Sequence, residues 1–392
     1  MNSISSNPMD RKRVILSAVA LSALGAMFYN LLPMFLGVAQ DYRELDNKGI
    51  GLLSSLFFAG YTLTTMTAFF WIRKFNWKIV TLFALTVGSL ALLLAGYSQS
   101  HGLLMLCIFV AGGAFSSVYG IGTTALGDTS NPARWYGMKI SAEAMLGAIL
   151  LFLLPGTLIS RFGFMGLMTG MVLAVVLLAP ALAWLPVGGN KQQHDDGQIH
   201  ISSQPRLAVW MGLFAVLAFI FSATMIWAFV ERIANTAGFE PVLVGRILSL
   251  TLLFAMLGSL AAVVMGDRFG SGKPFGAATV IFLFALAWLS NTTSLLNFSV
   301  GACLLTFAIG LGITYVITIV ADLDMDGRYV VLTVPAIGIG VMIAPAIGGL
   351  LTASQEFGAI FIVGGITVVL SLLASLLALY KGLPAVVKTP QS

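Results

Sequence analysis

The chain has 392 residues, of which 58% are hydrophobic and only 9% carry a charge. Because an average soluble domain contains roughly 25% charged residues, this composition excludes a soluble globular protein and indicates one embedded in a bilayer. The net charge of +5 alone would permit a nucleic-acid partner, but the placement of the basic residues gives it another explanation. Cys107 and Cys303 both lie inside apolar segments, so no disulfide framework is expected.

Apolar stretches long enough to cross ~30 Å of hydrocarbon as a helix, about 20 residues each, recur along the whole chain. The first follows Arg11, Lys12 and Arg13, as a signal peptide would, but its apolar run is too long and no convincing cleavage site follows. It is therefore expected to remain as the first membrane span. The twelve predicted spans are 14–38, 50–71, 78–98, 102–125, 137–160, 164–185, 208–230, 243–265, 275–293, 298–320, 329–352 and 358–380.

The basic residues predict the orientation of the chain, because Lys and Arg are retained on the cytoplasmic side. With the N-terminus inside, fifteen of the 20 basic residues fall on the inner side and five on the outer side. Both termini are thus predicted to be cytoplasmic in a multi-pass protein of the inner (cytoplasmic) cell membrane, and no nucleic acid is needed to explain the charge. The inner group is Arg11, Lys12, Arg13, Arg73, Lys74, Lys78, Arg134, Lys139, Lys191, Arg206, Arg268, Lys273, Arg328, Lys381 and Lys388, and the outer group is Arg43, Lys48, Arg161, Arg232 and Arg246.

The longest polar interval divides the chain evenly. It predicts an N-terminal six-helix bundle over 1–186, a cytoplasmic linker over 187–206 and a C-terminal six-helix bundle over 207–392. An internal repeat is suggested by matches between the halves. At an offset of 196, Cys107 meets Cys303, Tyr119 meets Tyr315 and Asp128 meets Asp324; at 194, Gly51 meets Gly245, Ser55 meets Ser249 and Arg134 meets Arg328.

The loop MGDRFGSGKP, residues 265–274, holds three charges among three glycines. Its GSGK ending is similar to a phosphate-binding loop, but Asp267 stands where the first glycine is needed and Pro274 replaces the hydroxyl residue. Nucleotide binding is therefore not expected. At the 194 offset, Lys74-Phe75-Asn76 aligns with Arg268-Phe269-Gly270, and since Asn and Gly adopt positive φ most readily, both loops are expected to turn in the same left-handed way.

Twelve helices in two halves, with a G-x-x-x-D-R-x-G-like loop between the second and third helix of a half, resemble the major facilitator superfamily over essentially the whole chain. The resemblance implies an all-α membrane protein with 12 transmembrane helices in two pseudo-symmetric six-helix bundles. It also implies a conformational latch at Asp267, Arg268 and Gly270, with Arg73 and Lys74 at the altered first-half position. The alternative for these loops is a tight solvated turn that satisfies topology.

Two further elements of that family match in part. Residues 340–349 resemble its G-x-x-x-G-P-x-x-G-G element, although small residues there also serve helix packing alone. The helix-five version, which marks antiporters in the family, is incomplete around Gly147 and Pro155. The family's Arg at the start of helix four is missing, which places drug–proton antiport in doubt.

Glu143 is the best candidate for proton coupling, because it is the one carboxylate well inside a predicted helix of the first half. If helix five begins near Tyr136, seven residues at 1.5 Å place Glu143 about 10 Å below the cytoplasmic boundary. Two interpretations remain open. Glu143 either carries a proton or pairs with a substrate amine, or it is a snorkelling or Lys139-paired carboxylate.

Other candidates rest on weaker signals. Amphipathic side chains on helices that line the family's central cavity suit a small organic solute, although such aromatics also favour packing or the membrane interface. Glu231, Arg232 and Arg246 would gate the outer mouth or form an exposed interfacial cluster. The cavity candidates are Tyr29, Asn30, Tyr61, Tyr119, Trp227 and Tyr315.

The sequence thus predicts a secondary active transporter for a small organic solute, coupled to protons, with symport or efflux undecided. An enzyme is not expected, since the three histidines lie in loops without a metal or catalytic motif, and neither a cofactor nor a metal site is expected. A channel filter is also absent from the sequence. The alternatives are an uncoupled facilitator and a lipid scramblase or membrane scaffold. A monomer in the lipid bilayer is expected.

Overall fold

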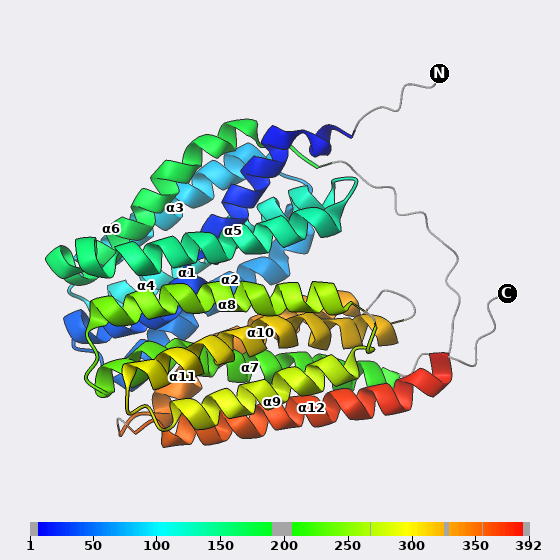
Figure 1. Ribbon diagram of the computed structural model, residues 1–392. Coiled ribbons are helices and arrows are strands. Elements are labelled where there is room, and N and C mark those ends of the chain that lie inside the picture. Colours follow the sequence, from blue (N-terminus) through cyan, green and yellow to red (C-terminus); the bar gives the residue numbers. More distant parts are fainter. Residues whose placement is uncertain (1–6, 190–205, 267, 325–328, 355, 387–392) are drawn as a thin grey trace. The chain divides into compact units, whose positions relative to one another are not determined.

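A computed structural model describes residues 7–189, 206–266, 268–324, 329–354 and 356–386. Within these ranges the secondary structure is helical (Figure 1). Short 3₁₀ helices cover Pro8–Asp10, Ala179–Trp184 and Val330–Leu332, and a π-helix covers Pro155–Ile159. The α-helices are α1 Lys12–Arg43, α2 Asn47–Trp71, α3 Trp77–Tyr97, α4 His101–Gly127, α5 Pro132–Leu153, α6 Ser160–Leu178, α7 Arg206–Thr236, α8 Pro241–Met265, α9 Gly272–Leu289, α10 Leu295–Leu323, α11 Thr333–Leu351 and α12 Gly358–Val386.

Eleven helical segments of the described residues are long and apolar enough to cross a membrane, against the twelve spans predicted. The difference lies in one segment of 51 residues, 134–184, which contains both α5 and α6. At 1.5 Å per residue a straight helix of that length would measure about 76 Å, more than twice the ~30 Å of hydrocarbon. The backbone reverses within it at Gly163, where φ is 54° and ψ is −131°, and Figure 1 shows α5 and α6 meeting at this reversal. The turn falls between the predicted spans 137–160 and 164–185.

The chain divides into two compact units, one of residues 1–38 and 56–197 and the other of residues 39–55 and 198–392. In the first unit α3 packs against α4 and α6. In the second, α7 packs against α11 and α12, α10 packs against α8 and α9, and α9 and α12 run side by side (Figure 1). The end of α1 and the first two turns of α2 group with the second unit.

Each unit contains a very close helix crossing of the same design, α2 with α4 in the first unit and α8 with α10 in the second. In the first unit, a Cβ on Gly60 would collide with the Phe109 carbonyl oxygen, and one on Gly112 with that of Phe57. In the second unit, Gly258 meets the carbonyl of Phe307 in the same manner, and Gly310 that of Ala255. All four positions correspond at a shift of 198 residues. The shift of 198 differs by four residues from the offset that aligned Gly51 with Gly245 and by two residues from the offset that aligned Tyr119 with Tyr315. In the register of these crossings, neither pair corresponds.

The small residues of α11 serve close packing. A Cβ on Gly340 would meet Ile220 of α7 at 3.0 Å, and one on Gly348 would meet Phe229 of α7 at 2.7 Å. A Cβ on Gly349 would collide with the Asn47 carbonyl oxygen at the start of α2. The packing interpretation of the 340–349 element therefore accounts for its glycines.

Candidate functional site

A charged and aromatic cluster lies in the first unit. Lys139 and Glu143, one turn apart on α5, form an ion pair of 2.9 Å between Nζ and Oε1. Their side chains are 7% and 13% exposed. The Lys139 ammonium also donates a hydrogen bond of 2.7 Å to the Tyr119 hydroxyl of α4. A lysine, a carboxylate and a phenol thus meet inside an apolar helix assembly.

Tyr119 is a predicted cavity residue, and two more, Asn30 and Tyr61, border this cluster. Asn30 of α1 donates through Nδ2 to the Glu143 backbone oxygen at 2.8 Å. The Tyr61 ring of α2 lies 6.0 Å from the Tyr119 ring, measured between centroids. Tyr29 instead packs against Phe58, at 6.2 Å between ring centroids. Asn30, Tyr61, Tyr119 and Glu143 are therefore brought together from four helices, α1, α2, α4 and α5.

Two other predicted cavity residues belong to the second unit. Trp227 of α7 is 3% exposed and Tyr315 of α10 is 4% exposed. The Tyr315 hydroxyl donates to the Gly266 backbone oxygen at the end of α8, at 3.0 Å. Its environment differs from that of Tyr119, in agreement with the shift of 198 residues at the helix crossings.

The sequence predicts Lys139 at the cytoplasmic end of the fifth span, and in the structure its side chain is only 7% exposed. Helix α5 begins at Pro132, where the Asn131 side chain caps the Arg134 amide. Lys139 therefore lies about 10 Å and Glu143 about 16 Å along the helix from its first residue, at 1.5 Å per residue. The signal that could have identified Lys139 is the i,i+4 spacing to Glu143 together with the Asn-Pro start at residues 131–132.

The predicted first-half latch residue Arg73 forms a bidentate ion pair. Its guanidinium donates to the Asp128 carboxylate at 2.5 and 2.7 Å, and Asp128, which follows α4, is 4% exposed. The pKa of Arg73 is raised above its ordinary value, chiefly by the hydrogen bond to Asp128. Lys74 is exposed beside it. In the sequence Asp128 stands out only as a repeat match, and nothing there identifies it as the partner of Arg73.

The chain leading into the linker covers this ion pair. The Trp77 amide donates to the Val187 carbonyl at 2.8 Å, and the Trp77 indole donates to the Ile72 carbonyl at 2.6 Å. A Cβ on Gly189 would collide with both Arg73 and Asp128. The α2–α3 loop, the end of α4 and residues 187–189 therefore form one packed assembly.

The second-half loop has a different arrangement. Asp267, the predicted latch carboxylate, lies outside the described residues, and Arg268 is exposed. Gly270 has the expected positive φ of 67°. The same expectation is wrong for Asn76, which has φ −66° and ψ 116° because its side chain caps α3 by accepting from the Lys78 and Ile79 amides.

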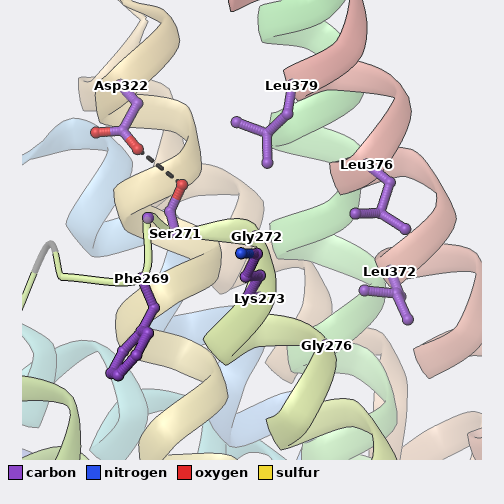
Figure 2. Close-up of a pocket in the computed structure, with 10 residues that line it drawn as sticks. Phe269, Ser271, Gly272, Lys273, Gly276, Asp322, Leu372, Leu376 and Leu379 are labelled. Carbon is purple, nitrogen blue, oxygen red and sulfur yellow. Dashed lines mark hydrogen bonds between the residues drawn. The ribbon is translucent and has the colours of Figure 1, made fainter. Parts of the chain in front are cut away.

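A hollow of about 700 Å³ borders this loop, between the start of α9 and α12 (Figure 2). The Ser271 hydroxyl donates to the Asp322 carboxylate at its rim, at 2.8 Å. Leu372, Leu376 and Leu379 of α12 line the opposite wall (Figure 2).

The predicted outer-gate residues lie at the adjacent ends of α7 and α8. Arg232 forms an ion pair of 2.9 Å with Asp41 at the end of α1. Glu231 is 6% exposed and accepts a hydrogen bond of 2.7 Å from Asn235. Arg246 is exposed on α8. Glu231 is thus buried, whereas the alternative of an interfacial cluster expected an exposed carboxylate.

Comparisons with known proteins agree with this architecture. Residues 14–323 match the family described as the Major Facilitator Superfamily. A solved structure of the nucleoside transporter NupG has a TM-score of 0.70 at 12% identity, covering 95% of this chain and 99% of that one. A bacterial homologue of the human lysosomal transporter Spinster, inward-facing and unoccupied, has a TM-score of 0.71 at 14% identity, covering 97% and 98%. No curated protein sequence matches the chain.

At these identities the solved structures establish only the fold, whereas the family match covers most of the chain. The helices, their apolar composition and the family match identify a multi-pass membrane transporter rather than an enzyme. The chain belongs to the major facilitator superfamily.

Proposed function

We propose that the chain is a secondary active transporter that moves a small organic solute by alternating access, driven by proton binding at Glu143. The observation that carries this proposal is the buried Lys139–Glu143 ion pair, surrounded by Asn30, Tyr61 and Tyr119. Charged side chains within a membrane cost at least about 2.5–3.5 kcal/mol each on insertion scales, and they mark ion and substrate pathways for that reason.

The charges of the pair favour coupling between a proton and a solute. A proton on Glu143 would leave the Lys139 ammonium as an uncompensated buried cation, and removing one partner of a buried pair costs about 3–5 kcal/mol. The Tyr119 hydroxyl accepts one of the three ammonium protons. A carboxylate, carbonyl or hydroxyl oxygen of the solute would replace the lost acceptor. Proton and solute would then bind together, which favours their co-transport.

The same cluster would serve an uncoupled facilitator if Glu143 remains ionised throughout the cycle. In that case the ion pair is a fixed part of the solute site, and solute moves only down its own gradient. A scramblase or membrane scaffold would transport no solute at all. Transport by the purified chain in lipid vesicles separates these three functions.

The test begins with a ligand. A thermal-shift screen of small organic acids, sugars and aromatic compounds identifies one, because a ligand raises apparent stability by RT ln(1 + [L]/Kd). In vesicles, Glu143→Gln mimics the protonated side chain but cannot release a proton. Counterflow exchange of the solute should persist in this variant, whereas accumulation driven by a proton gradient should be abolished.

The matched control is Glu240→Gln, which removes an exposed carboxylate just before α8. It should accumulate solute at the wild-type rate. Proton-driven accumulation by Glu143→Gln at that same rate would exclude Glu143 as the coupling group. Gradient-independent transport by the wild-type protein would instead support the facilitator.

A further inference from the structure

A second buried carboxylate lies near the C-terminal end of α7, and within the described ranges it forms no ion pair with a base. Glu231 is 6% exposed. Its Oε1 atom accepts a hydrogen bond of 2.7 Å from Nδ2 of Asn235, one turn later on the same helix. The other two oxygens of this pair of side chains, Glu231 Oε2 and Asn235 Oδ1, are buried and have no hydrogen-bond partner among the described residues.

Two buried acceptors without a protein donor are an unfavourable combination, because a buried polar atom is costly unless it is hydrogen-bonded. An ionised carboxylate cannot relieve it, since both of its oxygens only accept hydrogen bonds. A single proton on Oε2 would make this atom a hydroxyl donor. Oδ1 of Asn235, whose Nδ2 already donates to Oε1, would be the acceptor. Together with the Nδ2–Oε1 bond, this second bond would close a ring of two hydrogen bonds between a carboxylic acid and a carboxamide.

Among the described residues, Glu231 forms no ion pair with a basic side chain. The charges of Arg232 and Asp41 act on it, and these two are paired with each other at 2.9 Å. Helix α11 contains no charged residue, and the charge of α8 is that of the exposed Arg246. The charges of α10 and α12, Asp322 and Lys381, lie near the other end of α7, since Gly382 packs against Leu323 and Ala208.

We propose that Glu231 is a proton-binding site and that it is the neutral acid in this arrangement, hydrogen-bonded in a ring with Asn235. The proton comes from water and returns to water when the end of α7 becomes solvated. The proposed role of this site, a second proton-binding position in the transport cycle, rests on the proton coupling proposed above. The protonation itself does not depend on that coupling.

The sign of the pH dependence follows from proton linkage. A proton is bound while Glu231 is packed and is released when it is solvated, so lower pH favours the packed arrangement and higher pH favours the solvated one. The Asp41–Arg232 ion pair beside Glu231 holds the ends of α1 and α7 together. Deprotonation of Glu231 is therefore expected to accompany the loosening of this contact.

Infrared difference spectroscopy of the full chain in lipid vesicles tests the protonation without a solute. At neutral pH the wild-type protein should show the carbonyl stretch of a protonated carboxylic acid, and this band should disappear on titration to alkaline pH. Glu231→Gln should lack the band, because its amide reproduces the hydrogen-bonded ring without an acid. Glu143→Gln should retain it, which separates this site from the coupling carboxylate proposed above.

Asn235→Ala provides a second measurement. It keeps the acid but removes its partner, so the carbonyl stretch of Glu231 should move to the higher frequency of a less hydrogen-bonded acid. Glu240→Gln, at an exposed site, should leave the neutral-pH spectrum unchanged. Identical neutral-pH spectra for the wild type and a folded Glu231→Gln protein would overturn the proposal. If Glu231→Gln does not fold, an unshifted band in Asn235→Ala would overturn it.

Discussion

At the scale of single residues, the Arg73–Asp128 ion pair is the best-defined polar contact of the first unit. Nη1 of Arg73 donates to Oδ2 of Asp128 and Nη2 donates to Oδ1, and such bidentate geometry is the strong form of a charge-assisted hydrogen bond. Asp128 is buried, whereas the Arg73 side chain is 44% exposed, so solvent screening reduces the contribution of the charges. The contact joins the α2–α3 loop to the end of α4.

Replacing Asp128 with Asn should destabilise the purified protein by about 1–3 kcal/mol, because the buried side chain at position 128 would lose its charge-assisted hydrogen bonds to Arg73. Thermal unfolding measures the change. Lys74→Gln is the matched control, since it removes a neighbouring exposed charge that has no ion pair among the described residues, and its midpoint should stay at the wild-type value. Equal midpoints for Asp128→Asn and Lys74→Gln would mean that the ion pair contributes nothing to stability.

A functional residue could be predicted from the sequence only where its own type and position are sufficient evidence, without knowledge of its neighbours in the fold. Glu143 stands out because a carboxylate within an apolar stretch is costly wherever its partners lie. The spacing to Glu143 and the Asn-Pro start of α5 bear on the position of Lys139 along the helix, but its hydrogen bond to the Tyr119 hydroxyl of another helix could not be predicted. The φ of Asn76 was predicted wrongly, because Asn serves equally as a left-handed turn residue and as a helix cap.

At the scale of helices, the paired glycine crossings set how closely α2 approaches α4 and α8 approaches α10. A side chain at Gly112 or Gly310 would collide with backbone carbonyl oxygens of the opposite helix, those of Phe57 and Ala255. Backbone cannot move aside as a flexible side chain does, so the helices themselves would have to separate. The sequence alone did not indicate these contacts, because small residues are frequent throughout membrane helices.

Gly112→Ala and Gly310→Ala should each lower stability by roughly 1–3 kcal/mol, the usual cost of overpacking a tight contact. The control is Gly137→Ala in α5, where nothing lies within 4 Å of the added Cβ. That substitution should stabilise the protein by up to about 1 kcal/mol through helix propensity. Thermal unfolding of the three variants should therefore give two decreases and one increase. A decrease at Gly137 as large as the others would show that glycine itself, rather than the crossing, is required.

At the scale of the whole molecule, hydropathy predicted the helices well because a bilayer allows few alternatives: a spanning segment must satisfy its own backbone hydrogen bonds. The predicted spans match α1–α12 with modest differences at the ends. Helices α1 and α7 extend five and six residues beyond the predictions, to Arg43 and Thr236. Their last turns are polar, so a hydropathy criterion cannot distinguish them from loops. The predicted boundaries of the two bundles remain predictions.

The predicted orientation can be tested at the exposed end of α7. Thr236→Cys should react with a membrane-impermeant maleimide in intact cells, because the distribution of basic residues places this position outside. Phe75→Cys, in the exposed loop between α2 and α3, should react only after permeabilisation. The native Cys107 and Cys303 are buried and should add little background. The reverse labelling pattern at these two sites would invert the topology.

The packing of residues 187–189 has a consequence for expressing the protein as two separate fragments. The Val187 carbonyl accepts a hydrogen bond from the Trp77 amide, and Gly189 lies against Arg73 and Asp128. Residues 187–189 therefore pack as part of the first half, although they lie within the predicted linker. If the chain is divided after Gly189 and the two fragments are co-expressed, residues 187–189 stay on the first fragment. A division before Pro186 would place these residues on the second fragment, and they would then reach Trp77, Arg73 and Asp128 only when the two fragments associate. The useful cut site therefore lies several residues beyond the end of the last apolar segment of the first half.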